Sequence, residues 1–270
     1  MQTVAWLIFL TGAYPLTRAW QGNRRTSLFQ AVHWAIAAWA AWGGMMLVAL
    51  STAGGTADPT TAYLALCLTG CAAVAVLGAR RPGVGAWNFV LLGLLAVMLL
   101  PLAENLLAQR PATLDPLRLV FLGSTVLVGV LNYLPTRLAL AALLVGLACA
   151  GQLLELVGQP DQPPALSWWL LAVAPWAAFG LWKSRGRPAS EFDQVWLDFR
   201  DRFGFLWGQR TRDQFNRAAA NAGWPVVLRW QGLRLRPGAA LPEPAVQSAI
   251  VAALRALLKR FGEEAPADEE

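Results

Sequence analysis

The stretch SWWLLAVAPWAAFGLWKSRGRPASEFDQVWLDFRDRFGFLWGQRTRDQFNRAAANA, residues 167–222, decides how this chain is organised. Its first part, as far as Trp182, is almost entirely apolar, which is typical of a segment embedded in lipid. Lys183, Arg185 and Arg187 end that run, and Ser190 then begins a segment that mixes apolar and charged residues. The stretch therefore predicts a membrane domain before Lys183 and a water-soluble domain after it.

The composition of the whole chain agrees with a membrane domain. Hydrophobic residues make up 56% of the 270 residues and charged residues 14%, whereas an ordinary soluble domain is about 25% charged. Several apolar runs reach the ~17–25 residues that cross a bilayer. We predict an all-α polytopic bundle of about seven transmembrane helices over residues 1–182. The expected spans are residues 1–16, 28–50, 60–79, 86–107, 117–134, 138–157 and 165–182.

The basic residues between the spans predict the orientation. Arginines follow the first, third and fifth spans, and the basic linker of residues 183–189 follows the seventh. The connector after the fourth span, with Arg110 and Arg118, is the exception to this alternation. Since Lys and Arg are enriched in cytoplasmic loops, we expect the N-terminus outside and the C-terminal region in the cytoplasm. Short loops and a composition rich in Ala, Leu, Arg and Trp suit a bacterial inner membrane.

An internal repeat is also considered from the spacing of the spans. The second to fourth and the fifth to seventh spans would be two three-helix units of opposite orientation, as in inverted-repeat transporters. These two segments share no convincing residue-level similarity. An odd number of spans is by itself enough to explain the pattern.

Residues 190–262 predict a small cytoplasmic module with the order α-β-β-α. A helix is expected over residues 190–222, capped by Ser190 and interrupted at Gly204. Residues 226–230 and 233–236 predict a hairpin around Gln231 and Gly232, and residues 245–261 predict a second amphipathic helix. Residues 183–262 hold fourteen Lys and Arg against six Asp and Glu. The acidic residues 263–270 are expected to be disordered.

The leading functional hypothesis is a non-enzymatic membrane protein whose module docks a protein partner or the inner leaflet. Aromatic residues recur at helical spacing along residues 190–222, and Trp196, Phe199 and Phe203 are the expected contact. Three arginines of the hairpin, together with a tryptophan, are expected to bind phosphate or anionic headgroups, or else to be a solvated strand face. These hairpin residues are Arg229, Trp230, Arg234 and Arg236.

The second hypothesis is a small-solute transporter or permease. Glu104 and Asn105 lie at the outer end of the fourth span, and Gln152 and Glu155 lie at the outer end of the sixth. Polar residues at membrane depth are costly and often functional, so the four would line one outward-facing pocket. The alternative is that they are ordinary interface residues, and the same two readings apply to Asn132 and Tyr133 at the inner end of the fifth span.

The third hypothesis, ranked last, is a membrane enzyme that modifies lipids. His33, the one histidine, would act as a proton relay with a carboxylate, or would be a plain interfacial histidine. No catalytic motif is present, so an enzyme is disfavoured. No cofactor or metal is expected, and Cys67 and Cys71 are interpreted as small apolar residues. No nucleic-acid-binding signature accompanies the basic charge.

Overall fold

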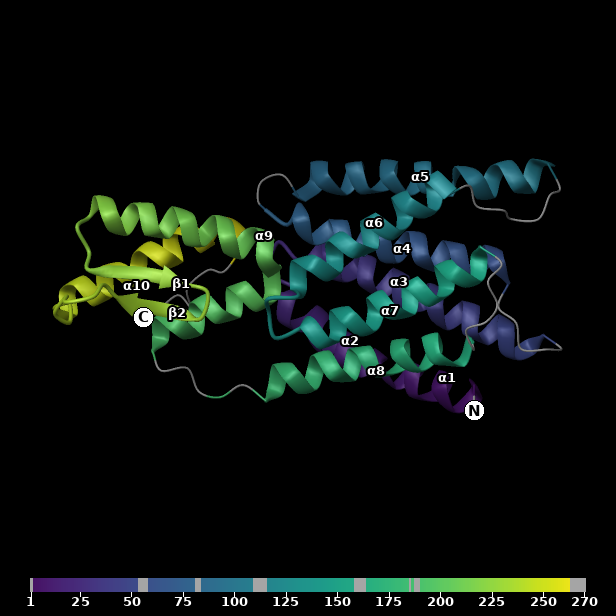
Figure 1. Ribbon diagram of the computed structural model, residues 1–270, viewed down its shortest axis with the longest axis horizontal. Coiled ribbons are helices and arrows are strands. Elements are labelled where there is room, and N and C mark those ends of the chain that lie inside the picture. Colours follow the sequence, from purple (N-terminus) through teal and green to yellow (C-terminus); the bar gives the residue numbers. More distant parts are fainter. Residues whose placement is uncertain are drawn as a thin grey trace.

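The computed structural model describes residues 2–52, 58–80, 84–108, 116–157, 164–184, 186 and 190–262. A bundle of helices occupies one end of the elongated molecule and a smaller module, which contains the hairpin, occupies the other (Figure 1). We call the end of the bundle that contacts this module the module end. The turns between α2 and α3 and between α6 and α7 lie there.

Five helices are long and apolar enough to cross a membrane, so the chain fits an integral membrane protein. Each of them lies within two residues of a predicted span. They are α3 (Phe29–Ser51), α4 (Pro59–Leu77), α5 (Val84–Ala108), α6 (Pro116–Tyr133) and α7 (Ala139–Leu156). The class of fold predicted from composition is therefore confirmed for these helices.

The first and the seventh predicted spans are not among these five helices. The first run is divided into α1 (Gln2–Thr11) and α2 (Ala13–Asn23), because the chain turns at Gly12, whose N–H donates to the Phe9 carbonyl oxygen at 2.9 Å. The seventh is α8 (Pro164–Lys183), which has Pro175 in its interior. Seven crossings and their orientation thus stay predictions.

Small residues let the helices of the bundle approach closely. A Cβ atom on Gly129 of α6 would lie 2.5 Å from the Ala73 Cβ atom of α4, so a larger residue would separate these helices. Cys67 and Cys71 are buried free thiols within this core, as the sequence predicts for small apolar side chains.

The module begins with α9 (Glu191–Asn221), which consists of two arms. Ser190 caps it, because its Oγ atom accepts a hydrogen bond from the Asp193 N–H at 3.1 Å. Gly204 has φ 77° and ψ −166°, and this non-helical residue bends α9 between the arms. The predicted cap and the predicted interruption are both confirmed.

The hairpin lies between the two arms of α9. Strands β1 (Val226–Arg229) and β2 (Gly232–Leu235) are antiparallel, with Arg229 opposite Gly232. The turn is therefore formed by Trp230 and Gln231, one residue earlier than predicted. Gly232 has φ 138°, a value that favours glycine, so the chain places it at the start of β2.

Side chains from both arms of α9 satisfy the outer edges of this two-stranded sheet. The Asp193 carboxylate accepts from the Leu233 N–H at 2.8 Å on the β2 side. The Asn216 side chain accepts from the Leu228 N–H at 2.7 Å and donates to the Leu228 carbonyl oxygen at 3.0 Å on the β1 side. A two-stranded hairpin is marginal alone, and α9 thus supplies the partners that further strands would give.

The last helix closes the core of the module. Helix α10 (Pro244–Leu258) continues into a short 3₁₀ turn, η1 (Lys259–Phe261). Phe261 is fully buried, and its ring lies 4.9 Å from the ring centroids of both Phe199 and Phe203. The aromatic core of the module is continuous with apolar residues at the module end of the bundle, namely Leu28, Ala31, Ala75, Val76, Ala79 and Leu91.

Candidate functional site

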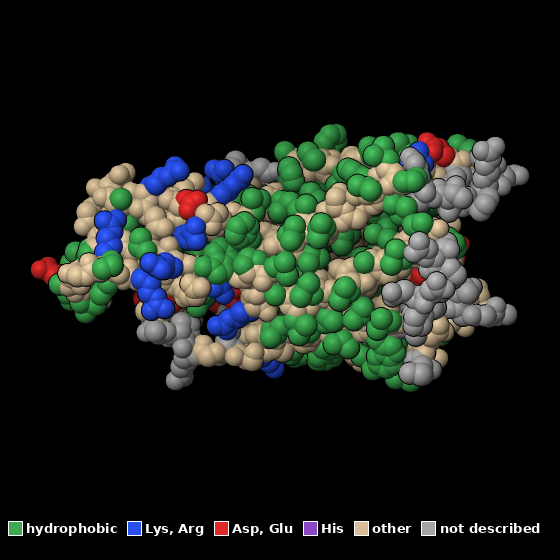
Figure 2. All heavy atoms as spheres, viewed as in Figure 1, with side chains coloured by type: hydrophobic (Ala, Val, Ile, Leu, Met, Phe, Trp, Pro, Cys, Tyr) green, Lys and Arg blue, Asp and Glu red, His purple; other side chains and the backbone are tan. Residues whose placement is uncertain are grey.

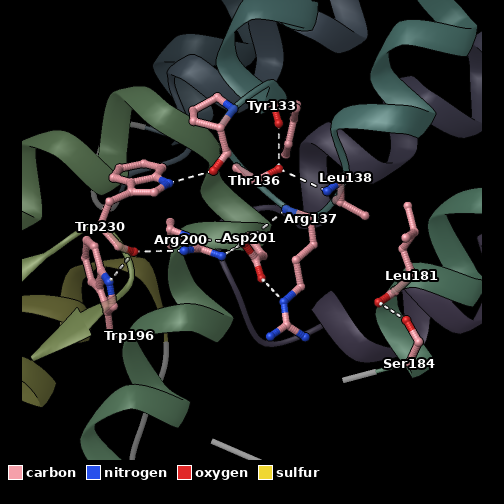
Figure 3. A network of polar contacts seen from close by, with 11 residues as sticks. Tyr133, Thr136, Arg137, Leu138, Leu181, Ser184, Trp196, Arg200, Asp201 and Trp230 are labelled. Carbon is pink, nitrogen blue, oxygen red and sulfur yellow. Dashed lines mark hydrogen bonds and ion pairs between the residues drawn. The ribbon is translucent and has the colours of Figure 1, made fainter. Parts of the chain in front are cut away.

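The strongest concentration of buried polar contacts lies where the module meets the bundle. We call this region the junction: residues 132–137 at the turn between α6 and α7, residues 200–206 at the bend of α9, and Trp230 of the hairpin turn. Figure 3 shows part of the junction, in which Arg137 from the turn, Asp201 from α9 and Trp230 from the hairpin turn lie close to one another. Each contact of the junction either joins the membrane bundle to the module or fixes the position of a side chain that does so.

The amide of Asn132 holds the bend of α9. Its Nδ2 atom donates to the Phe203 carbonyl oxygen at 3.4 Å, and its Oδ1 atom accepts from the Leu206 N–H at 2.9 Å. These bonds serve backbone groups that the bend at Gly204 removes from the helical pattern. A Cβ atom on Gly204 would lie 2.1 Å from Asn132 Nδ2, so only glycine fits. The neighbouring Tyr133 hydroxyl donates to the Arg202 carbonyl oxygen at 2.8 Å.

A buried carboxylate forms the charged part of the junction. Asp201 is fully buried, and its Oδ1 atom accepts from Arg200 at 2.6 and 2.9 Å. Arg137, from the turn of the bundle, places its Nε atom 3.6 Å from Asp201 Oδ2. Burying a charge is costly unless it is paired. The two guanidinium groups supply this pairing, and one comes from each side of the junction.

The hairpin turn joins the same network through Trp230. Its carbonyl oxygen accepts from Arg200 at 2.8 Å and from the Trp196 indole at 3.3 Å. Its own indole donates to the Pro135 carbonyl oxygen at 2.6 Å. These hydrogen bonds therefore fix the hairpin, the bend of α9 and the end of the bundle relative to one another.

A second contact ties the end of the module to the other turn of the bundle. The Ser27 N–H donates to the Phe261 carbonyl oxygen at 3.0 Å, and the Ser27 hydroxyl donates to the Ala79 carbonyl oxygen at 2.8 Å. The Trp207 indole also donates to the Val76 carbonyl oxygen, at 3.1 Å. The module is thus attached to the ends of α3 and α4 as well as to the turn between α6 and α7.

The chemistry of these contacts is structural. The carboxylate is paired with two arginines, although its Oδ2 atom accepts no hydrogen bond from the described residues, and no side chain of the junction pairs a nucleophile with a base. Among the residues that the structure describes, no group of three or more His, Cys, Asp or Glu side chains could hold a metal ion. The arrangement can fix the position of the module relative to the bundle.

The predicted aromatic contact surface is buried within the chain. Trp196, Phe199 and Phe203 are each fully buried under the hairpin, α10 and the module end of the bundle. Because these side chains already pack against the chain itself, they present no surface to a partner. The predicted role of these three residues as an exposed contact is therefore wrong.

The other predicted contact residues lie in the hairpin or directly beside it. Trp230 belongs to the junction, whereas Arg229 is exposed in β1 beside it. Arg236 is exposed beyond the far end of β2. Arg234 lines an open groove of about 850 Å³ between β2, the start of α9 and α10. The strand register places Arg229 and Arg234 on the same face of the hairpin, and Arg236 continues that face. Their role as a headgroup contact stays a prediction.

The predicted outer polar cluster is divided into two pairs. Glu104 of α5 pairs with Arg118 of α6 at 3.0 Å, and both side chains are substantially exposed. Gln152 of α7 is only 1% exposed and donates to Glu155 on the same helix. No contact between the two pairs is found in the part of the chain that the structure describes. The side chain of Asn105 lies outside the described residues.

His33 occupies an exposed position beside aromatic rings. Its Nε2 atom accepts from the Trp20 indole at 3.3 Å, and its Nδ1 atom lies 2.8 Å from the Phe29 carbonyl oxygen, to which it donates. Neither ring nitrogen contacts a carboxylate among the described side chains. This geometry matches the interfacial alternative, and it lacks the acid that a proton relay requires.

Sequence reasoning did not identify the residues that form the junction as a site. In the sequence, Asn132 is a polar residue at the end of a span and Gly204 is an interruption in a helix, but no sequence pattern shows that the two are in contact. They are 72 positions apart. The sequence contains two signals, a polar residue beside a turn and a glycine inside a helical pattern, and only the folded chain brings the two residues together.

No protein-family model, no curated protein and no solved structure matches this chain. The class of protein therefore comes from the fold alone: a helical membrane protein with a small mixed module attached to one end of its bundle.

Proposed function

We propose that this chain is a non-enzymatic integral membrane protein whose basic module lies on the inner leaflet and binds anionic headgroups. In this proposal the membrane is a bacterial inner membrane, the N-terminus is outside and the module is cytoplasmic. The carrying observation is a set of cations stacked over aromatic rings at the module end of the bundle. They are Arg24 over Trp20 at 4.1 Å, Lys183 over Phe179 at 4.7 Å and Arg202 over Trp182 at 5.4 Å.

The position of these pairs supports contact with headgroups. They lie near the ends of α2 and α8 and on the first arm of α9, where the apolar surface of the bundle gives way to the module. On the face drawn in Figure 2, hydrophobic side chains cover the bundle, and Lys and Arg gather over the module and its border. Indole rings favour the membrane interface, and basic residues near the surface attract anionic lipid.

Of the two expected partners, a protein is less well supported than the inner leaflet. The aromatic side that a partner would have bound is covered by the chain itself. Arg24 and Lys183 are exposed and Arg202 is partly buried, and a headgroup layer is the partner whose charge these cations complement.

Lipid retention tests this proposal. The full chain would be purified in mild detergent from bacterial membranes, and the retained phosphatidylglycerol, cardiolipin and phosphatidylethanolamine would be quantified by mass spectrometry. Each of Arg24→Gln, Lys183→Gln and Arg202→Gln should weaken anionic-lipid binding by about fivefold, from about 1 kcal/mol per cation. Arg236→Gln removes the same charge beyond the far strand end and should change little. Equal retention in all four variants would overturn the proposal.

Small-solute transport is a second candidate, favoured by the buried pair on α7. Gln152 and Glu155 each keep one side-chain oxygen that is buried and has no hydrogen-bond partner among the described residues. A buried carboxylate oxygen without a partner is costly and suits a group that takes up a proton or a cation. Support comes from this pair alone, since Glu104 pairs elsewhere.

Proton flux in proteoliposomes tests the transport candidate. An imposed pH gradient would be followed with an enclosed pH-sensitive dye for the parent, Glu155→Gln and Glu104→Gln. The candidate expects slower flux for Glu155→Gln only, because Glu104 is exposed and bound to Arg118. Unchanged flux for Glu155→Gln, or equal slowing for both variants, would exclude it.

A further inference from the structure

The two turns at the module end of the bundle have the same hydrogen bonds, at positions 110 residues apart. In each turn a threonine N–H donates to the carbonyl oxygen three residues earlier at 3.0 Å. The threonine hydroxyl donates to the same oxygen, at 3.0 and 2.7 Å, and accepts from the leucine N–H two residues later, at 3.3 and 3.1 Å. The equivalent residues are Asn23 and Tyr133, Thr26 and Thr136, and Leu28 and Leu138.

The helices that follow these turns repeat as well. Helices α3 and α7 begin at equivalent positions, and α4 and α8 each begin with a proline, Pro59 and Pro164. Several residues buried in one unit are matched by residues buried in the other, 110 positions later from α3 to α7 and 105 positions later from α4 to α8. These pairs are Ala31 and Ala141, Ala38 and Ala148, Trp42 and Gln152, Ala62 and Ser167, Tyr63 and Trp168, Leu66 and Leu171, and Cys67 and Ala172.

The contacts between the two units are reciprocal. The first helical segment of each unit packs on the third helix of the other: α1 packs on α8, and α6 packs on α4. A Cβ atom on Gly12 would lie 3.2 Å from Pro175, and one on Gly70 would lie 3.7 Å from Leu122. Gly12 is equivalent to Leu122 and Gly70 to Pro175, so exchanging the units reproduces the contact. This is the relation of a pseudo-two-fold axis that runs along the bundle.

Both units have the same orientation, with α5 as the connecting helix. The unit of α1 to α4 and the unit of α6 to α8 each place their first turn at the module end. The repeat therefore pairs the first to third predicted spans with the fifth to seventh, and not the second to fourth with the fifth to seventh. Parallel repeats of this kind occur in membrane transport proteins.

The module binds the same backbone position in both turns. Ser27 and Arg137 are equivalent, and each carries an N–H that begins a membrane helix and has no partner within it. The Ser27 N–H donates to the Phe261 carbonyl oxygen at 3.0 Å, and the Arg137 N–H donates to Asp201 Oδ1 at 3.4 Å. Phe261 of the module core thus bonds to the unit of α1 to α4, and Asp201 near the bend of α9 bonds to the unit of α6 to α8.

We propose that residues 190–262 are a strap that joins the two equivalent units and holds their module ends at a fixed separation. The contact between units consists largely of small and apolar residues, which allow sliding because they form few directional bonds. The two anchors of the strap are directional hydrogen bonds and a buried ion pair. The units change their separation at this end only when one anchor is released. This inference does not depend on lipid binding.

The distance between the turns tests the strap. Spin labels would be placed at Gly22→Cys and Leu134→Cys, both beside the turns and exposed, in the full chain reconstituted in nanodiscs. The native cysteines are buried. Gly204→Ala drives a Cβ atom into Asn132 and should broaden the distance distribution or add a longer peak. Gly238→Ala is the matched control, because Gly238 also has φ 77° but has open space around it.

The result that would overturn the strap is a parent-like distribution in Gly204→Ala while faster proteolysis before Ser190 shows that the module is loosened. If Gly204→Ala does not yield folded protein, Asn132→Ala decides, because it removes the amide that holds the bend without adding atoms. A broader distribution in that variant supports the strap, and a parent-like one refutes it.

Discussion

At the scale of single residues, the junction depends on polar groups that are buried only because each has a partner. Asp201 is fully buried and lies between Arg200 and Arg137, while Asn132 serves the backbone at Gly204. Removing one partner leaves the other in an apolar surrounding without compensation. Such losses cost more than the bond itself contributes.

Asp201→Ala should therefore destabilise the folded protein strongly. Arg200 is only 7% exposed and would be left without its counter-charge, a loss of about 3–5 kcal/mol. Asp213→Ala is the control, since that carboxylate is half-exposed and lies 3.7 Å from Arg212, so about 0–1 kcal/mol is expected. Thermal unfolding in detergent, followed by tryptophan fluorescence, compares the two. Equal melting temperatures would show that the buried pair contributes nothing.

At the scale of elements, the hairpin exists because α9 bends around it. Within the described part of the chain, neither strand has a neighbour beyond the other, and the Asp193 and Asn216 side chains bond the outer edges. Residues in the sequence of α9 therefore help to stabilise the two strands. The hairpin pattern in residues 226–236 could be recognised alone, but its stability could not be derived from it.

Asp193→Ala should loosen β2 without unfolding α9. The Leu233 N–H loses its 2.8 Å acceptor, and a hydrogen bond contributes about 0.5–1.5 kcal/mol, so its exchange with solvent should accelerate roughly twofold to tenfold. Glu191→Ala serves for comparison, because Glu191 is exposed and pairs with Arg255 of α10 instead of with the hairpin. Hydrogen exchange measured by mass spectrometry on the hairpin peptide distinguishes them. The same exchange rate in both variants would contradict this role for Asp193.

At the scale of the whole molecule, the bundle and the module share one apolar core. Leu28, Val76 and Leu91 of the bundle belong to the same buried cluster as Phe199 and Phe261 of the module. We therefore expect the module to contribute to the stability of the membrane domain.

Deletion of residues 190–270 should destabilise the bundle, because it exposes that cluster to water. We expect aggregation or a lower melting temperature by size-exclusion chromatography and thermal unfolding in detergent. Deletion of residues 263–270 alone removes none of the contacts described above and is the control. A monodisperse truncated bundle that melts like the full chain would show that the two parts are independent.

The amino-acid sequence alone was enough to predict five membrane helices, the cap at Ser190, the bend at Gly204 and the order of elements in the module. These features follow from local rules: length of apolar runs, side-chain capping and backbone preference. The burial of Trp196 and Phe203, the pairing of Asn132 with Gly204 and the two-fold relation of the units were decided only by tertiary structure. An apolar helix face does not specify what covers it, and contacts between distant residues have no local signature.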